Sequence, residues 1–193
     1  PSTTDKVVLI SEHKDGSRTV GESKIPEASS PIKKMYISPE ECRPTKETID
    51  AIKKADVIII GPGSLYTSIM PNLLIKGMSE EILKSKAKKI YICNVMTQHG
   101  ETDGYKVSNH IQALINHTRE GIIEYVIANT ERVPKELLDK YAEEKAYSVE
   151  LDSENVKRLG CEIIKANIID TKDCVRHNPY KLARIIFDLI LNI

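Results

Sequence analysis

The sequence predicts an α/β fold in which helices cover both faces of a mostly parallel sheet. Short apolar runs rich in β-branched residues, such as residues 57–60, are typical of strands buried on both faces. Segments with apolar residues at helical spacing separate these runs, and strands that alternate with helices pair in parallel through crossovers. An Asp-Gly turn near the start adds a β-hairpin.

The first elements are strands. Residues 6–12 and 18–21 flank Asp15-Gly16, where glycine supplies the positive φ that a tight hairpin needs. Residues 34–37 form a further short strand. Such a hairpin usually decorates a sheet and does not form its centre.

Helices and buried strands then alternate to the end of the chain. The expected strands cover residues 57–60, 89–95, 124–128 and 162–169, with an extended piece at 147–151. Thr45, Pro134, Asp152 and Asn178 mark helix starts. The expected helices cover residues 45–54, 72–75, 79–84, 134–145, 152–159 and 178–190, and one more helix presents Val107, Ile111 and Leu114 inward from a cap at Thr102 or Asp103.

Composition limits the class of protein. The 193 residues, 40% of them hydrophobic, predict a single α/β domain over residues 1–193. Lys+Arg and Asp+Glu are both 28, so no net field favours nucleic acid or an acidic membrane. No apolar run approaches the roughly 20 residues of a spanning helix. Four well-separated cysteines without a CxxC pair predict no zinc site and a cytoplasmic protein, and a start at Pro1 leads us to expect a fragment.

Two unusually polar loops follow neighbouring strands. The first is residues 61–68 and the second is residues 94–102. Loops at the carboxyl ends of adjacent parallel strands converge, and open α/β folds bind phosphates and nucleotides there. Hydroxyls and backbone N–H groups suit a phosphate and a sugar. The binding residues expected in the loops are Gly61, Gly63, Ser64, Tyr66, Thr67, Ser68, Asn94, Thr97, Gln98, Glu101 and Thr102.

Each assignment has a structural alternative. The glycines also suit a plain strand-to-helix connection, since the loop is neither a Walker loop nor a GxGxxG fingerprint. Tyr66 is either a lid that stacks on a base or a residue of the helix face. His99 either pairs with Glu101 as acid and base or has a structural role. His177 and Asn178 either lie near a bound anion or serve as a solvated side chain and a helix cap. No catalytic residue and no metal-ligand spacing is assigned.

Several segments together resemble the YvcK-type gluconeogenesis factors of the CofD-like superfamily. They are Asp15-Gly16, residues 21–25, GPGSLYTSIMPNLL at 61–74, YICNVMTQHGET at 91–102 and His177-Asn178-Pro179. The resemblance covers nearly the whole chain. It implies a Rossmann-like fold, a cytoplasmic location, and a role in cell shape and envelope supply during growth on gluconeogenic carbon sources. Members of this type bind UDP-sugars, notably UDP-N-acetylglucosamine.

The chain departs from that family in three places. The opening GGGTGL loop is absent, so we expect the carboxyl-terminal three-fifths or so of a family member. The family's MTQPGET reads MTQHGET here, with His99 in place of proline. The terminal HDP reads HNP, and Asn178 cannot supply the negative charge of an aspartate.

Three functions are compatible with these observations. The first is a regulatory factor, not an enzyme, that binds a nucleotide-sugar. The second is a CofD-type transferase that moves phospholactate onto a deazaflavin and uses a divalent metal. The third is a non-catalytic interaction module or scaffold, with a homo-oligomer as one form. None of the three involves nucleic acid or insertion into a membrane.

Overall fold

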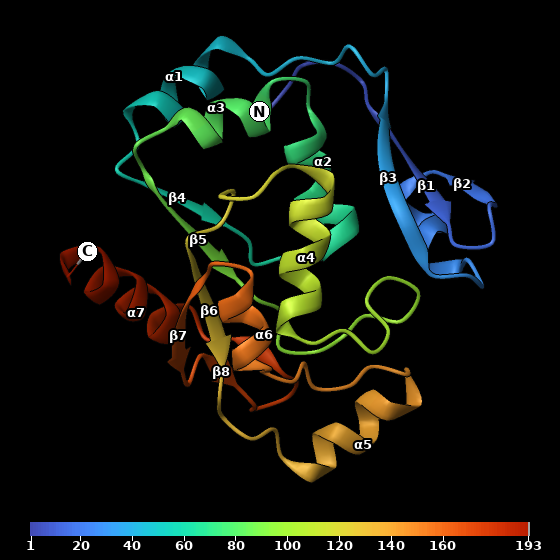
Figure 1. Ribbon diagram of the computed structural model, residues 1–193. Coiled ribbons are helices and arrows are strands. Elements are labelled where there is room, and N and C mark those ends of the chain that lie inside the picture. The colour runs from blue at the N-terminus through green and yellow to red at the C-terminus, as the bar shows by residue number, and fades with distance from the viewer. Residues whose placement is uncertain (193) are drawn as a thin grey trace.

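The main sheet of the protein has four parallel strands in the order β4-β5-β6-β7, as the computed structural model, which describes residues 1–192, shows in Figure 1. The strands are β4 (Val57–Ile60), β5 (Lys88–Ile92), β6 (Tyr125–Asn129) and β7 (Glu162–Ala166). Ile60 stands opposite Tyr91, so β4 and β5 end together. The predicted α/β class is confirmed.

Helices cover both faces of this sheet. They are α1 (Lys46–Lys54), α2 (Met70–Leu74), α3 (Met78–Lys84), α4 (Val107–His117), α5 (Lys135–Glu143), α6 (Ser153–Arg158) and α7 (Pro179–Asn192). Ile111 of α4 belongs to one apolar core and Leu182 of α7 to a second. Alternate strand residues point to the two cores, since Tyr91 belongs to the first and Ile90 to the second. Among residues 1–192, no helix combines the length and apolar character that a membrane span requires.

A second sheet of three antiparallel strands, in the order β2-β1-β3, lies apart from the main sheet in Figure 1. It comprises β1 (Val8–His13), β2 (Arg18–Val20) and β3 (Ile32–Ser38), with a 3₁₀ turn η1 (Glu22–Glu27) that the sequence pattern does not predict. The predicted hairpin is confirmed, and Asp15 accepts a hydrogen bond from the Ser17 N–H at 2.9 Å. His117 of α4 accepts the Met35 N–H at 2.9 Å and so ties β3 to the helix layer.

The predicted strand over residues 162–169 is too long, because β7 ends at Ala166. The Asn129 side chain, at the end of β6, accepts the Ile168 N–H at 3.4 Å in place of a strand neighbour. The chain therefore leaves the sheet. It returns as an antiparallel pair formed by β8 (Ile169–Asp170) and β9 (Arg176–His177).

Thr102 and Asp103 do not cap α4, contrary to the expectation. The helix begins at Val107. The Thr102 hydroxyl accepts the Gln98 N–H at 2.9 Å, and the Asp103 carboxylate accepts the Gly100 N–H at 2.8 Å. Both side chains are used inside the loop, so the chain runs on before the helix starts.

Candidate functional site

The two polar loops lie side by side at the carboxyl-terminal edge of the main sheet. Residues 61–68 leave β4 and residues 94–102 leave its parallel neighbour β5. Gly61 allows the first loop to pass close to β5, because its φ is +90° and an added Cβ would lie 3.1 Å from the Ile92 carbonyl oxygen. Another residue would be strained in this conformation. The glycine thus sets where the loop begins.

Glu101 joins the two loops. One carboxylate oxygen accepts the Tyr66 N–H at 3.2 Å, and the other accepts the Thr67 hydroxyl at 2.9 Å and the Gln98 side-chain amide at 2.7 Å. Glu101 is 4% exposed. Burial raises the pKa of its carboxyl group, while the hydrogen bonds from Thr67 and Tyr66 act in the opposite direction. Four of the predicted site residues therefore form one bonded group between the loops.

The first loop continues into a short π-helical turn that presents two serines. The Ser64 carbonyl oxygen accepts the Ser68 N–H and the Ile69 N–H, both at 3.0 Å, at the start of the π-helical turn η2 (Leu65–Ile69). Ser64 is half-buried and Ser68 is exposed. Within the described part of the chain, neither hydroxyl has a hydrogen-bond partner. These hydroxyls are available to a ligand.

The Tyr66 ring lies inside the protein. It is 2% exposed, and its hydroxyl bonds to the Tyr105 hydroxyl at 2.7 Å. His117 packs edge-on against it at a centroid distance of 5.9 Å. Burial raises the pKa of the Tyr66 phenol. What Tyr66 offers at the site is therefore its backbone, held by Glu101.

Thr97 and Thr102 support the second loop from within. Both are buried. The Thr97 hydroxyl accepts the Tyr147 N–H at 2.9 Å, and the Thr97 N–H donates to the Tyr147 carbonyl at 2.7 Å. The Thr102 hydroxyl is bonded to Gln98, as described above. These bonds fix the shape of the loop and leave the two threonine hydroxyls turned into the protein.

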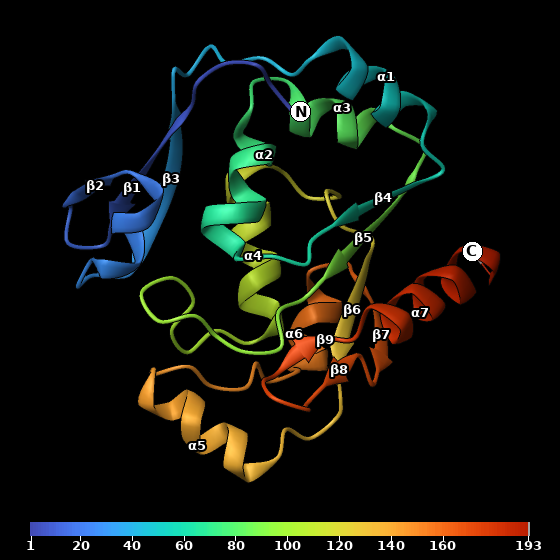
Figure 2. The same cartoon turned by 180° about the vertical axis from the view of Figure 1, so that it is seen from behind.

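Asn94 and His177 share a small cavity of about 190 Å³ at the end of β5. Figure 2 shows β9, which carries His177, beside this edge of the sheet. The His177 Nε2–H donates to the Cys93 carbonyl at 3.2 Å, and burial lowers the pKa of the imidazole, so the ring is neutral at pH 7. The buried Asn94 Oδ1 has no partner among residues 1–192. An acceptor in this state suits a ligand that donates a hydrogen bond.

Asn178 caps α7. Its Oδ1 accepts the Tyr180 N–H at 3.1 Å and the Lys181 N–H at 3.0 Å. Its own N–H donates to the Ile168 carbonyl at 2.7 Å. Asn178 follows His177 directly, so the cap also holds the imidazole in place beside the cavity.

His99 does not bond to Glu101. Its Nδ1 lies 2.9 Å from an Asp103 carboxylate oxygen, and both side chains are about half exposed. The carboxylate of Glu101 is occupied by the donors of the two loops. The acid–base pair that the sequence left open as one alternative is therefore not formed in this arrangement.

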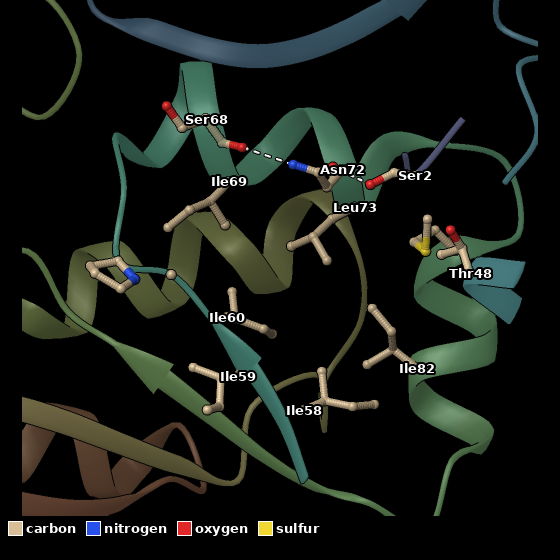
Figure 3. A pocket seen from close by; sticks show the side chains of 13 residues that line it. Ser2, Thr48, Ile58, Ile59, Ile60, Ser68, Ile69, Asn72, Leu73 and Ile82 are labelled. Carbon is tan, nitrogen blue, oxygen red and sulfur yellow. Dashed lines mark hydrogen bonds between the residues drawn. The ribbon is translucent and has the colours of Figure 1, made fainter. Parts of the chain in front are cut away.

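An apolar groove of about 340 Å³ runs along the free side of β4 and opens at the first loop. Figure 3 shows Ile58, Ile59 and Ile60 along one wall and Ile69, Leu73 and Ile82 along the other. Gly61, Pro62 and Ser68 line the end of the groove next to the site. Gly61 and Ser68 therefore face this groove, whereas Asn94 and His177 face the smaller cavity.

Apart from the sequence neighbours of Asn94 and His177, which are Val95, Met96 and Arg176, the small cavity is lined by two residues that sequence reasoning missed, Tyr141 and Val175. The Tyr141 hydroxyl accepts the Val175 N–H at 3.1 Å, which ties α5 to the chain just before β9. No motif marks either residue. Val175 directly precedes β9, which the sequence pattern does not predict, and Tyr141 comes from α5, so neither lies near Asn94 in the sequence.

No group of three or more His, Cys, Asp or Glu side chains that could hold a metal ion occurs in the part of the chain that the structure describes. The cysteines Cys42, Cys93 and Cys161 are buried and free, and Cys174 is half-buried and free.

The chain is similar to a known protein family and to several bacterial proteins. The family described as "2-phospho-L-lactate transferase CofD" matches residues 1–169. The "Gluconeogenesis factor" of Bacillus subtilis (strain 168) is 47% identical over 191 residues, which are 98% of this chain and 60% of that protein. The "Putative gluconeogenesis factor" of Thermotoga maritima is 39% identical over 96% of this chain and 60% of that protein.

A solved structure has the same fold. The crystal structure of protein BH3568 from Bacillus halodurans matches with a TM-score of 0.95 and 44% identity, over 97% of this chain and 60% of that one. The chain thus spans about three fifths of the length of these relatives.

Proposed function

Because the chain belongs to the 2-phospho-L-lactate transferase CofD family, we propose that it binds a nucleotide-linked sugar such as UDP-N-acetylglucosamine and acts as a regulatory factor. The names of its relatives, gluconeogenesis factors, support a role in growth on gluconeogenic carbon sources. Control of cell shape and envelope supply, and a cytoplasmic location, are part of the same proposal.

One observation carries the proposal. The hydroxyls of Ser64 and Ser68 are unbonded, and they stand on a turn that Glu101 holds at the carboxyl end of the sheet. Parallel α/β sheets bind anions at this edge with hydroxyls and backbone N–H groups. The unpartnered Asn94 Oδ1 adds an acceptor for an N–H or O–H group of the ligand. The described residues thus offer partners for both a phosphate and a neutral polar group.

Calorimetric titration with UDP-N-acetylglucosamine tests the proposal. In Ser64→Asp, a carboxylate would stand where we place a phosphate, and two such charges about 4 Å apart repel by about 4 kcal/mol at an effective dielectric constant of about 20. We expect binding to be lost while the melting temperature stays near that of the wild type. Ser79→Asp, which adds the same charge in the first turn of α3, is the control and should bind normally. Absence of heat from the wild type at millimolar ligand would refute the proposal.

The description of the matched family favours a second candidate, transfer of phospholactate to a deazaflavin acceptor. We expect this reaction to use a divalent metal, but the described residues contain no group of three or more His, Cys, Asp or Glu side chains that could hold one. We therefore assign no step of it to this chain. Incubation with the activated donor and the deazaflavin, followed by mass spectrometry, would reveal the phospholactyl product.

A further inference from the structure

The contact between the two polar loops depends on one buried carboxylate. Glu101 receives hydrogen bonds from Tyr66 and Thr67 of the first loop and from Gln98 of its own loop. Three donors converge on two oxygens. An ionised carboxylate accepts all three bonds, whereas an amide at this position would present its own N–H₂ to one or more donors.

The backbone around Glu101 is fixed as well. Gly100 packs so tightly that an added Cβ would lie 1.9 Å from the Pro26 carbonyl oxygen. On the other side, the Thr102 hydroxyl holds the Gln98 N–H. The backbone is therefore held on both sides of Glu101, whose carboxylate already accepts three hydrogen bonds.

The first loop gains its position from these bonds. Tyr66 and Thr67 lie between Ser64 and Ser68 in a turn whose ends are joined by the bond from the Ser68 N–H to the Ser64 carbonyl. A carboxylate that holds the middle of the turn therefore sets where both serine hydroxyls stand relative to the second loop.

We propose that Glu101 is a positioning residue that locks the 61–68 loop against the 94–102 loop, so that Ser64 and Ser68 meet the phosphate of a nucleotide-sugar ligand. Glu101 itself does not contact the ligand. This inference rests on the proposed function for its ligand. The sequence predicts Glu101 as a ligand contact, whereas in this proposal it acts through Tyr66 and Thr67.

Thr67 supplies a test that separates hydrogen bonding from packing. Valine has nearly the shape of threonine but lacks the hydroxyl, while serine keeps the hydroxyl and lacks the methyl group. If the bond to Glu101 positions the loop, Thr67→Val weakens affinity for UDP-N-acetylglucosamine by roughly tenfold to a hundredfold, and Thr67→Ser binds within a few-fold of the wild type. If Thr67 only packs, the order of the two variants is reversed, and the inference is wrong.

Glu101→Gln and Asp103→Asn form a second pair. Each removes one negative charge from the same stretch of chain, but Asp103, which directly follows the second loop, bonds to His99 and Gly100 and not to the first loop. We expect Glu101→Gln to lose affinity for UDP-N-acetylglucosamine as Thr67→Val does, and Asp103→Asn to bind it normally. The double variant that combines Thr67→Val with Glu101→Gln should bind no more weakly than either single variant. Equal losses in Glu101→Gln and Asp103→Asn would overturn the inference. If Glu101→Gln does not fold, the Thr67 pair still decides.

Hydrogen exchange without ligand keeps this inference separate from the proposed function. The Tyr66 amide, bonded to Glu101, should exchange at least about tenfold faster in Thr67→Val than in the wild type or in Thr67→Ser. If the wild type binds no UDP-N-acetylglucosamine, the proposed function fails and the exchange rates alone decide whether Glu101 holds the loop. Equal rates in all three proteins would refute it.

Discussion

Gly100 shows at the scale of one residue how the site loop is fixed to the small sheet. Its φ is +79°, and the space where a Cβ would lie is occupied by the backbone of Pro26 at the end of η1. A glycine is therefore required for two reasons, conformation and close approach. The neighbouring Gly104 has a φ of +70° but faces open space.

We predict that Gly100→Ala is much more destabilising than Gly104→Ala. Both variants strain the backbone by roughly 1–2 kcal/mol, but only Gly100→Ala also forces the loop away from Pro26. Its free energy of unfolding should fall by several kcal/mol in total. Urea denaturation of the two variants and the wild type measures the difference. Equal losses would show that the contact with Pro26 yields at little cost.

The sequence predicts single residues well where their role is local. The residues beside Asn178 and Asp15 predict a helix cap and a turn, and both side chains make the expected backbone contacts. Glu101 could not be assigned in this way, because its partners Tyr66 and Thr67 belong to another loop more than 30 residues earlier. The need for glycine at position 100 likewise depends on Pro26, which no local pattern connects with it.

At the scale of elements, His117 joins α4 to β3. Its Nδ1–H donates to the Ala113 carbonyl at 2.7 Å, so its Nε2 is free to accept the Met35 N–H. Burial lowers the pKa of His117 below its usual 6.5. A proton on Nε2 would replace the acceptor with a donor facing another donor. The contact between α4 and β3 therefore depends on a neutral imidazole.

We predict that the protein loses stability as the pH falls below about 6.5. The unfolded chain binds a proton at the usual pKa of His117, whereas the folded protein resists it, so the unfolded state holds more protons and unfolding becomes easier in acid. Each such histidine lowers the free energy of unfolding by at most about 1.4 kcal/mol for each pH unit of acidification. His110 and His177, whose pKa values are also lowered by burial, act in the same direction.

Thermal unfolding at about pH 7.5 and about pH 5.5 measures this effect. His117→Gln keeps an oxygen that can accept the Met35 N–H but cannot be protonated, so its melting temperature should fall less in acid than that of the wild type. His99→Gln, at a half-exposed site outside the contact with β3, is the control and should not show the smaller acid shift of His117→Gln. Identical acid shifts in all three proteins would contradict the assignment.

Elements with their own periodic pattern were predicted, and elements created by long-range pairing were not. The four parallel strands and α7 follow from apolar runs and a capping motif. The two-residue strands β8 and β9 have no pattern of their own, since each exists only through its pairing with the other. For the same reason the cavity that holds Asn94 and His177 could not be foreseen, although both residues were named.

At the scale of the whole molecule, the two edge strands of the main sheet, β4 and β7, differ. β7 carries Glu162 and Lys165 as exposed residues, whereas β4 is made only of valine and isoleucine. Ile59 of β4 is 44% exposed beside the apolar groove. Charged side chains protect a sheet edge from pairing with other chains, and a bare apolar edge invites it.

We predict that Ile59→Lys reduces self-association of this chain. Light scattering over a range of protein concentrations should show larger species for the wild type than for the variant. Val20→Lys, which changes an exposed valine on the edge strand β2 of the small sheet, is the control and should scatter as the wild type does. A wild type that stays monomeric at every concentration would refute the prediction.

The class of fold could be predicted from the sequence because alternation of strands and helices leaves few topologies open. The order of the strands at the edges, and so the exposure of Ile59, is known only from the structure.

Because the two edges of the main sheet differ, a strand from another chain would add at one edge in preference to the other. The apolar side of β4 favours addition of another strand, while Glu162 and Lys165 discourage addition beyond β7. An assembly built through this sheet would therefore stop after one partner had joined, and it would end as a closed pair and not as an extending filament. Because the groove opens at Gly61 and Ser68, whatever joins there would also lie beside the proposed ligand site.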